Sequence, residues 1–469
     1  MKLHTFKIGG VHPDDNKITA EIATQVFDLP KQAIFPLSQH IGAPAKPVVQ
    51  RGDKVKVGTL LAEAGGFVSA PVYSSVSGTV AKIDTAIDAS GYRKPVIIVN
   101  VEGDEWEETI DRSDKLETLE AHPELTPEEI VNRIKVAGVT GMGGAGFPTF
   151  IKLCPPPTAK AECVIINGVE CEPYITADYR LMMEHADEIL VGLDLLMKAA
   201  KVDKGYIGIE DNKPAAIKLM TEKASKNPNI EIVPLAKKYP QGGEKQLVDA
   251  VINRQVPAPP AIPVNVGAIV QNVGTAFAVY EAVMKHKPLF ERYTTVTGKQ
   301  VKNPGNFLVR MGTPFQQLID HCGGLPDGDN KVLSGGPMMG KAVISLDVPV
   351  VKGTNSITIL TGDDAHRQGP QPCIRCGKCV DACPMGLEPY LLATLSSMKN
   401  YERLESEDIT LCISCGSCQF TCPSQRPILD NILQGKGAVM GIIRARAAEA
   451  KAKAEAEKAK AEAKEAEKK

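Results

Sequence analysis

Short apolar runs separated by glycines mark the chain from about residue 30 to residue 103. Val48-Val49 and Leu60-Leu61 are two such runs, and glycines such as Gly52 and Gly58 interrupt the pattern. Short strands joined by glycine turns are typical of a small β-sandwich or barrel, so we expect a β-rich unit here. The acidic and polar stretch from residue 106 to 125 lacks this pattern and is predicted to be a linker.

An alternation of strand and helix patterns follows. Thr126-Pro127-Glu128-Glu129 combines a capping box with proline at the first helical position, so a helix is predicted to begin there. The apolar spacing then predicts a strand at 164–166, a long helix over 181–196, a strand at 206–209, a helix over 214–225 and a strand at 230–233. This order favours a parallel sheet with helices on its faces.

The second half of the chain returns to short strands. Between residues 293 and 361 the pattern predicts strands with one helix near residues 315–321, which fits a small β-grasp module. Residues 444–469 are almost only Ala, Lys, Glu and Arg, a composition with high helix propensity but no large apolar stripe. We therefore expect a solvated helix at this end, and a docking arm for a membrane partner is the alternative.

Together these patterns predict a multidomain protein of α/β and β units. The predicted units are an N-terminal segment with a hammerhead (barrel-sandwich) domain at 1–105, a Rossmann-like α/β domain at 124–290, a β-grasp domain at 291–362, an α-helical ferredoxin-like domain at 363–438 and a helical Ala/Lys/Glu tail at 439–469. The first domain resembles biotinyl and lipoyl carrier domains. Those domains expose a lysine at a hairpin tip, where this chain has Glu63-Ala64-Gly65-Gly66, so we expect the fold without the carrier function.

Composition narrows the class of protein. The chain has 469 residues, a formal net charge of −2, 43% hydrophobic and 23% charged residues, which is ordinary for a globular protein and gives no basic excess for nucleic acid. The most apolar stretch, residues 264–283, is interrupted by Asn265, Gln271 and Asn272, so no membrane span is predicted. The N-terminus lacks the apolar core of a secretory signal. We therefore expect the protein to be located in a reducing cytoplasm.

Two copies of one cysteine pattern give the strongest chemical signal in the chain. Each copy reads C-x2-C-x2-C-x3-C-P, which is the spacing of bacterial two-cluster ferredoxins. Disulfides and structural zinc are the alternatives, but zinc sites favour pairs of C-x2-C over triplets with a trailing Cys-Pro. Two [4Fe–4S] clusters are therefore predicted. The copies are Cys373, Cys376, Cys379 and Cys383-Pro384, and Cys412, Cys415, Cys418 and Cys422-Pro423.

The fourth cysteine of each copy is predicted to cross to the other cluster. Three thiolates on one tight loop can hold three corners of a cubane, and the fourth lies too far along the chain to close the same cluster. The predicted ligand sets are Cys373, Cys376, Cys379 and Cys422 for one cluster, and Cys412, Cys415, Cys418 and Cys383 for the other. The remaining cysteines show no ligand spacing and are expected to be buried thiols: Cys154, Cys163, Cys171 and Cys322.

A glycine-rich segment, residues 138–149, gives the second chemical signal. Its glycines let the backbone approach a phosphate or a flat ring with amides directed at the ligand. A helix precedes it, unlike the usual dinucleotide fingerprint, and a close-packed glycine turn is the alternative interpretation. Three more polar turns accompany it: residues 167–173 after a buried strand, 239–245 at a helix start, and 271–275.

These four segments resemble the flavin- and NADH-binding subunit of respiratory complex I. The pattern in that family is close to G-x-G-G-A-G-F-P-T, N-x-D-E-x-E-P, Y-x-x-G-E-E and N-N-V-E-T. This chain departs from it at Val169, Gly243, Gln271 and Gly274, so some flavin contacts are expected to differ in detail.

Residues 1 to about 440 resemble the C subunit of the Rnf complex, the ion-translocating ferredoxin:NAD oxidoreductase. Gly9-Gly10-Val11-His12-Pro13, the lysine-free hammerhead, the glycine-rich segment, the β-grasp unit and both ferredoxin motifs occur in that family's order. The resemblance implies non-covalent FMN, an NADH site above it in the α/β domain, and two [4Fe–4S] clusters. The cofactor-binding residues that it implies are Gly141, Gly143, Gly144, Gly146, Phe147, Lys152, Asn167, Glu170, Glu172, Gly242, Glu244, Asn272 and Thr275.

Some of these residues have plainer interpretations. Lys152 also fits a solvated helix lysine, and Phe147 also fits an ordinary core residue. Glu170 and Glu172 are less easily explained as solvated residues, because an acid pair around Cys171 ahead of Pro173 is an unusual surface choice.

The predicted function is that of a peripheral electron-transfer subunit on the cytoplasmic side of the cell membrane. Hydride is exchanged between NAD(H) and FMN, and single electrons pass through the clusters. Hydride transfer itself needs no acid–base group, so no catalytic residue is predicted. The implied partners are the membrane subunits of the complex and a ferredoxin-type iron–sulfur subunit, without nucleic acid and without direct membrane insertion. A subunit of a soluble NAD-dependent ferredoxin reductase or hydrogenase-type complex, and a structural adaptor, are the alternatives.

Overall fold

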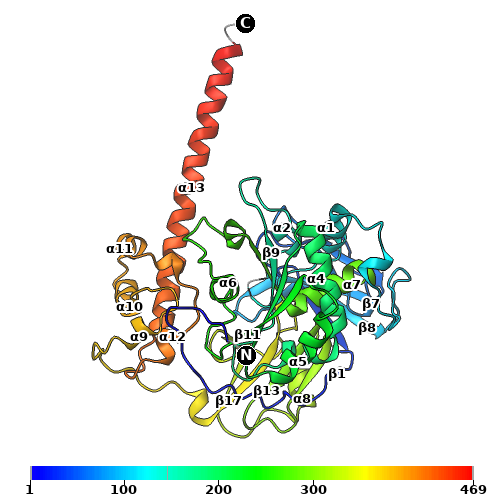
Figure 1. The fold of residues 1–469 in the computed structure, drawn as a ribbon, viewed down its shortest axis with the longest axis horizontal. Coiled ribbons are helices and arrows are strands. Elements are labelled where there is room, and N and C mark those ends of the chain that lie inside the picture. The colour runs from blue at the N-terminus through cyan, green and yellow to red at the C-terminus, as the bar shows by residue number, and fades with distance from the viewer. Residues whose placement is uncertain (1–2, 145, 467–469) are drawn as a thin grey trace. The chain divides into compact units, whose positions relative to one another are not determined.

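The computed structural model describes residues 3–144 and 146–466, with side chains described as far as residue 455 (Figure 1). The end of the predicted tail, residues 467–469, lies outside the described residues, as do Met1, Lys2 and Ala145. The chain forms two compact units. The first combines the residues up to Lys7 with His12–Arg367, and the second combines Ile8–Val11 with Gln368–Lys469.

Two antiparallel sheets form the β-rich start of the first unit, as the glycine-punctuated runs predict. Alternate residues such as Phe35, Leu61 and Ile97 face inward and form one core, because successive side chains of a strand point to opposite sides. One sheet has the order β2 (Gln32–Pro36), β8 (Arg93–Gly103), β7 (Ser77–Ile87), β4 (Lys54–Val55), and the other has β3 (Lys46–Pro47), β5 (Leu60–Glu63), β6 (Val72–Tyr73).

The predicted linker at 106–125 is instead packed against the fold. Trp106 meets Phe290 edge-on with 5.4 Å between ring centroids, and Ile110 is buried with them. Arg310 lies over the Trp106 ring, 4.7 Å from its centroid, so a cation covers the aromatic face. The polar composition concealed these few anchoring residues. A single 3-10 turn, η1 (Leu119–Ala121), interrupts the stretch.

The predicted parallel sheet is present, with strand order β11-β10-β9-β12. Val164 and Ile166 of β9 face the larger helical layer, whereas Cys163 and Ile165 face α6 on the other side. The strands are β9 (Cys163–Asn167), β10 (Gly205–Glu210), β11 (Ile230–Leu235) and β12 (Ala268–Asn272). The helices are α1 (Pro127–Val136), α2 (Thr149–Lys152), α3 (Ala177–Glu184), α4 (Ala186–Ala200), α5 (Pro214–Ala224), α6 (Glu244–Ile252), α7 (Val273–Met284) and the 3-10 turn η2 (Pro263–Val266).

The start of α1 is determined by local sequence, whereas the break between α3 and α4 depends on distant residues. Thr126 caps α1 by accepting a hydrogen bond from the Glu129 amide at 3.1 Å, as the capping pattern predicts. The prediction of one long helix over 181–196 is wrong, because the chain leaves helical geometry at His185. The His185 ring lies 4.8 Å from that of Phe277 and bonds the Tyr293 hydroxyl at 2.9 Å. These tertiary contacts favour the break between two helices that bury one continuous apolar face.

A six-stranded mixed sheet follows, with a parallel β13–β17 pair between antiparallel neighbours. Helix α8 (Phe315–His321), predicted at this position, packs Phe315, Leu318 and Ile319 against the sheet. The finer description as a β-grasp stays a prediction. The order is β1 (Gln25–Val26), β14 (Gly305–Arg310), β13 (Glu291–Thr297), β17 (Ser356–Thr361), β15 (Asn330–Ser334), β16 (Lys341–Ala342), and the 3-10 turn η3 (Gly362–Ala365) follows β17.

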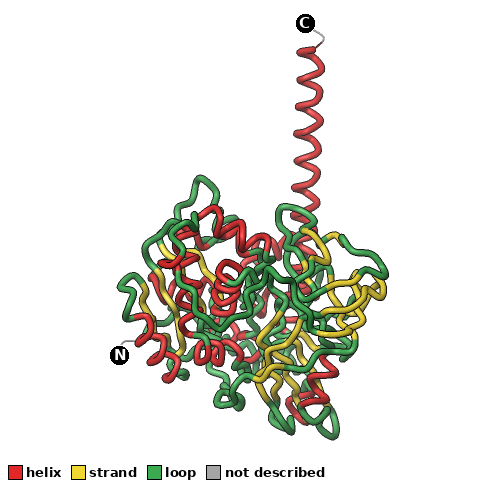
Figure 2. Tube along the Cα trace, turned by 90° about the vertical axis from the view of Figure 1, so that its right-hand side faces the viewer, coloured by secondary structure: helices red, strands yellow, loops and turns green. Residues whose placement is uncertain are grey.

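The second unit is helical. Its last element, α13 (Ile428–Ala466), runs without interruption across the predicted boundary at 438/439. Figure 2 shows it as one long helix that leads to the C-terminus. Ile428, Ile432 and Val439 are buried among the short helices, so the tail continues a helix that begins inside the cluster-binding region. The other elements are α9 (Lys378–Asp381), α10 (Pro389–Ser397), α11 (Tyr401–Ser406), η4 (Ile409–Leu411) and α12 (Ser417–Phe420). Among the described residues, no helix is both long and apolar enough to span a bilayer.

Candidate functional site

The carboxyl edge of the parallel sheet brings three of the four predicted polar segments together. Asn167 ends β9 and Asn272 ends β12, and the two are direct partners in the strand register. The Asn167 side-chain amide donates to the Gly242 carbonyl at 2.8 Å, and Asn272 caps α7 by accepting from the Gly274 amide at 2.8 Å. Ligands of open α/β sheets bind at this edge, so the geometry agrees with the predicted location.

The glycine-rich segment, the fourth, lies against Asn272 and Thr275. The Met142 amide donates to the Thr275 hydroxyl at 3.0 Å. A Cβ on Gly143 would lie 2.9 Å from the Asn272 side-chain nitrogen, whereas a Cβ on Gly144 would meet nothing within 4 Å. The backbone at Gly143 is therefore in close approach to a predicted flavin residue, while Gly144 borders open space.

The rest of this segment is held by its own backbone. The Gly141 amide donates to the Phe147 carbonyl at 2.8 Å, which closes the loop around the residues between them. Gly146 adopts φ +70° and lies against Gln39 and His40, so a side chain there would be strained. Phe147 is half-buried, intermediate between a core residue and a ligand-facing one.

Lys152 is not a solvated helix lysine. Its ammonium, at the end of α2, donates to the Glu244 carboxylate at 2.8 Å and to the Val270 carbonyl at 3.0 Å. Glu244 is the first residue of α6, where the helix dipole favours a negative charge. The sequence analysis assigned Lys152 and Glu244, which are far apart in the chain, to the same site, and in the structure they form an ion pair.

The two acids of the segment after β9 are buried and bonded to backbone amides. Glu170 accepts from the Asp178 amide at 2.7 Å and so caps α3, and Glu172 accepts from the Met339 amide at 2.7 Å. Burial raises the pKa of each carboxyl to about 7. Neither carboxylate is a solvated surface group, and each holds backbone amides that fix the shape of the loop.

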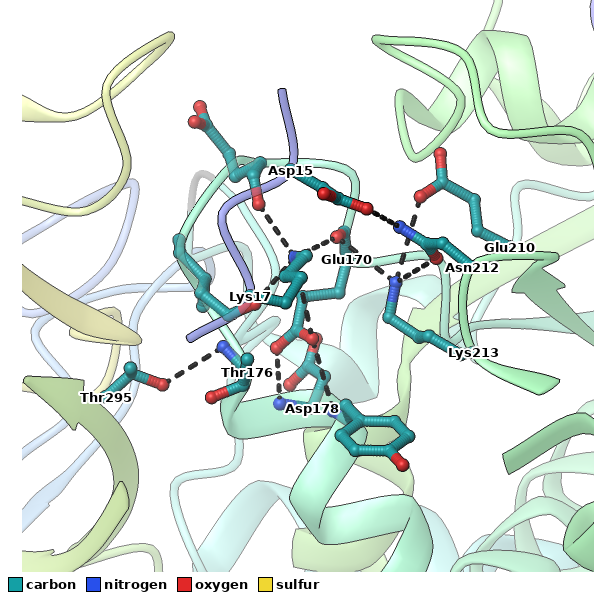
Figure 3. Close-up of polar contacts among 12 residues, drawn as sticks. Asp15, Lys17, Glu170, Thr176, Asp178, Glu210, Asn212, Lys213 and Thr295 are labelled. Atoms are coloured by element: carbon teal, nitrogen blue, oxygen red, sulfur yellow. Dashed lines mark hydrogen bonds and ion pairs between the residues drawn. The ribbon is translucent and has the colours of Figure 1, made fainter. Parts of the chain in front are cut away.

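Several residues around the site escaped the sequence analysis. Lys17 and Lys213 converge on the carbonyl groups of the segment after β9 (Figure 3). Arg292, from β13, donates to the Met142 carbonyl at 3.0 Å, and Lys352 donates to the Gly138 carbonyl at 2.7 Å. Burial lowers the pKa of Lys352 to about 7. Only Lys352 left a signal in the sequence: it directly follows an apolar run, which suggests a buried position for this lysine.

One side chain at this edge is polar, buried and unpaired. Gln271 is 2% exposed, and within the described residues neither its amide nitrogen nor its amide oxygen has a hydrogen-bond partner. A buried amide without partners is unfavourable by about 1–3 kcal/mol. A polar ligand group at this edge would remove that penalty, so the residues present fit the predicted cofactor.

The cysteines of the second unit lie in two groups. Cys383, Cys412, Cys415 and Cys418 line one cavity together with apolar residues that include Leu392 and Ile432. In the other set, burial is the main cause that raises the pKa of Cys379. Cys422 and Cys373 lie close enough to raise this pKa further. Each crossing cysteine therefore lies beside the set to which the sequence assigns it.

The two sets have different surroundings. Cys415 and Cys418 are buried, whereas Cys373 and Cys376 are exposed. Among the described residues no group of three His, Cys, Asp or Glu side chains is suited to a single metal ion. A cubane spreads its thiolates over four iron corners, so the wider spacing fits a cluster.

Of the other cysteines, Cys163 and Cys322 are buried as expected, but Cys154 is exposed and Cys171 is half-buried.

Four family models match successive parts of the chain. They are the RnfC barrel sandwich hybrid domain at residues 4–104, the Nuo51 FMN-binding domain at 134–281, the SLBB domain at 293–342 and a 4Fe-4S dicluster domain at 372–426. Each match falls inside one of the units predicted from the sequence.

Curated relatives extend over most of the chain. The C subunit of the proton-translocating ferredoxin:NAD(+) oxidoreductase complex of Clostridium ljungdahlii is 44% identical over 407 residues, covering 86% of this chain and 87% of that protein. The Na(+)-translocating counterpart of Acetobacterium woodii is 43% identical over 410 residues, covering 87% and 91%. The C subunit of the ion-translocating oxidoreductase complex of Rhodobacter capsulatus is 41% identical over 399 residues, covering 83% and 75%.

The flavin-type α/β edge and the paired cysteine sets define an iron–sulfur flavoprotein of the electron-transfer class. The chain belongs to the family of C subunits of the ion-translocating ferredoxin:NAD oxidoreductase (Rnf) complexes. It is therefore an oxidoreductase subunit, and the predictions of family, of FMN and two [4Fe–4S] clusters, and of an electron-transfer role are confirmed.

Proposed function

We propose that the carboxyl edge of the parallel sheet is where this chain binds FMN and NAD(H), and that the two cysteine sets hold its [4Fe–4S] clusters. The observation that carries the proposal is the convergence of the glycine-rich segment on Asn272 and Thr275 beside the unpaired Gln271 amide. When bound, FMN joins the two-electron exchange with NAD(H) to the one-electron chemistry of the clusters.

The residues of this edge have distinct roles in the proposal. Gly141, Gly143, Gly144 and Gly146 keep the backbone free of side chains so that it can approach the flavin. The amides of Asn167 and Asn272, the Thr275 hydroxyl and the Lys152–Glu244 pair line the same edge, with Gly242 between them. Glu170 belongs to the proposed flavin contacts, whereas Glu172 and Phe147 border the position proposed for the nicotinamide or adenine.

The cysteines divide into two ligand sets in the proposal. Cys412, Cys415, Cys418 and Cys383 hold one cluster in the apolar cavity, and Cys373, Cys376, Cys379 and Cys422 hold the other nearer the surface. A cluster with exposed ligands is suited to exchange electrons with another carrier, and a ferredoxin-type iron–sulfur subunit is the partner that we propose.

The test is the composition of the full chain purified without oxygen. We expect one FMN and about eight iron atoms per chain, four for each cubane. NADH should bleach the visible absorption of both the flavin and the clusters. Protein that contains iron but no flavin, and whose spectrum NADH leaves unchanged, would favour the adaptor alternative and refute the proposal.

We also propose that the chain works at the cytoplasmic side of the membrane, attached through the membrane subunits of its complex. The relatives are named as subunits of ion-translocating complexes, and the described part of the chain has no helix able to span a bilayer. A soluble ferredoxin reductase or hydrogenase-type complex would share the cofactors but lack this attachment.

Removal of residues 444–469 should leave both cofactor sites and membrane recovery unchanged. Among the described side chains of α13, the buried ones, including Val439, precede the cut, and the tail sequence lacks the Trp, Phe and Leu face of an interfacial anchor. The measurement is fractionation of full-length and truncated protein, with and without the partner subunits. Recovery of the full chain in membranes when all partners are deleted would contradict the proposed mode of attachment.

A further inference from the structure

The segment that follows β9, residues 168–176, has a backbone shape that its own sequence does not favour. Glu170 has φ +45° and Tyr174 has φ +71°, although both are ordinary L-residues with side chains. Each such residue is strained by about 1 kcal/mol or more, and the strain persists only where the surroundings impose it. Something outside the segment must therefore hold it in this shape.

Lys17 is the residue in the right place to do so (Figure 3). Its ammonium donates to the carbonyl groups of Glu170, Glu172 and Ile175 at 2.8, 2.8 and 2.6 Å. The three N–H groups of a lysine are all used, and the three acceptors span the strained part of the segment. The Lys17 side chain is 13% exposed, so water does not compete strongly for these bonds.

Neighbouring contacts fasten the same segment from two further directions. Lys213, at the start of α5, donates to the Val169 carbonyl at 2.7 Å, and the Asp15 carbonyl accepts from the Tyr174 amide at 2.8 Å. The carbonyl groups are thus drawn toward two buried cations. Burial of a charge is unfavourable unless the charge is well paired, and an apolar side chain could fill the same volume without that penalty. The buried lysines are therefore better explained by their bonds to the carbonyl groups than by filling of space.

We propose that Lys17 is a positioning residue for the flavin site: by gathering three carbonyl groups of residues 170–175 it fixes Asn167 and Glu170 in the geometry that binds FMN. This inference rests on the proposed function of the carboxyl edge. It adds to the site a residue from the N-terminal strap, residues 12–17, which lies outside the matched FMN-binding domain.

The test compares Lys17→Met with Lys285→Met in the full chain. Lys285 is a matched control, because it is also buried and its ammonium donates to Asp111, Ser113 and Lys115. It follows the C-terminal end of α7, about 18 Å of helix away from Asn272 at the other end. We expect Lys17→Met to raise the Kd for FMN by roughly tenfold or more, because charged hydrogen bonds are lost.

Lys285→Met should lower the melting temperature without changing the Kd for FMN. Hydrogen exchange of the flavin-free protein gives a readout apart from activity: amides 170–176 should exchange faster in Lys17→Met and normally in the control. Iron content should stay unchanged in both variants. Should Lys17→Met fail to fold, Lys17→Arg serves instead, because a planar guanidinium keeps the charge but cannot converge on three carbonyl groups.

Two results separate this proposal from the one on which it rests. If the unmodified chain binds no FMN, the proposed function fails. If the unmodified chain binds FMN and the Lys17 variants bind it equally well, with unchanged exchange of amides 170–176, Lys17 is an ordinary structural residue and the inference is overturned.

Discussion

Changing Cys383 to serine should remove the cluster held by Cys412, Cys415 and Cys418 and leave the other intact. Cys383 belongs to the first cysteine motif but lines the cavity of the second. Loss of one thiolate ligand should lower the iron content by about four atoms per chain, since a cubane is lost as a unit. Iron analysis and low-temperature paramagnetic resonance of the reduced protein measure the result.

The reciprocal change provides the control. Cys422→Ser should instead remove the cluster of Cys373, Cys376 and Cys379, with an equal loss of iron but the other resonance signal retained. FMN should stay bound in both variants, because the cysteines belong to the second compact unit and the flavin residues to the first. If each variant loses the cluster of its own motif, the crossing assignment is wrong.

Gly143→Val should abolish FMN binding and spare both clusters. Even a Cβ at this position would lie 2.9–3.1 Å from atoms of the Asn272 side chain, which itself caps α7 and is not free to move away. The two further methyl groups of valine increase the overlap, and a packed loop relaxes little. We expect the FMN released on denaturation to fall below about a tenth of the normal amount, the tenfold change that 1.4 kcal/mol produces.

Gly369→Val is the matched control for the glycine-loop variant. A Cβ on Gly369 meets nothing within 4 Å, so a valine there tests the substitution without the steric conflict. NADH:ferricyanide activity and iron content should be normal in the control. Normal FMN content in Gly143→Val would mean that the glycine-rich segment is a close-packed turn and not a cofactor loop.

Features with a local physical cause were predictable from the sequence. The cap at Thr126, the helix at residues 315–321 and the strands β9, β10 and β11 of the parallel sheet follow from capping, periodicity and turn residues. The cysteine sets were predictable for a similar reason, because ligand spacing along a tight loop is a local property.

Features set by distant contacts were not predictable. The break at His185 depends on the rings of Phe277 and Tyr293, which lie far along the chain. Lys17 is a single lysine near the N-terminus, and only the fold shows that three carbonyl groups converge on it. Strand β12 was not predicted either, because its apolar residues are continuous in sequence with those of α7.

The N-terminal glycine pair has a consequence for biosynthesis. A Cβ on Gly9 would lie 2.5 Å from the Cys383 carbonyl, and the Gly10 amide donates to the Ala382 carbonyl at 3.0 Å. The turn that presents a crossing ligand is thus completed by residues that are synthesised long before the cysteines. Cluster insertion should follow synthesis of both segments, and a fragment beginning at Gln368 lacks part of its own cluster-binding unit.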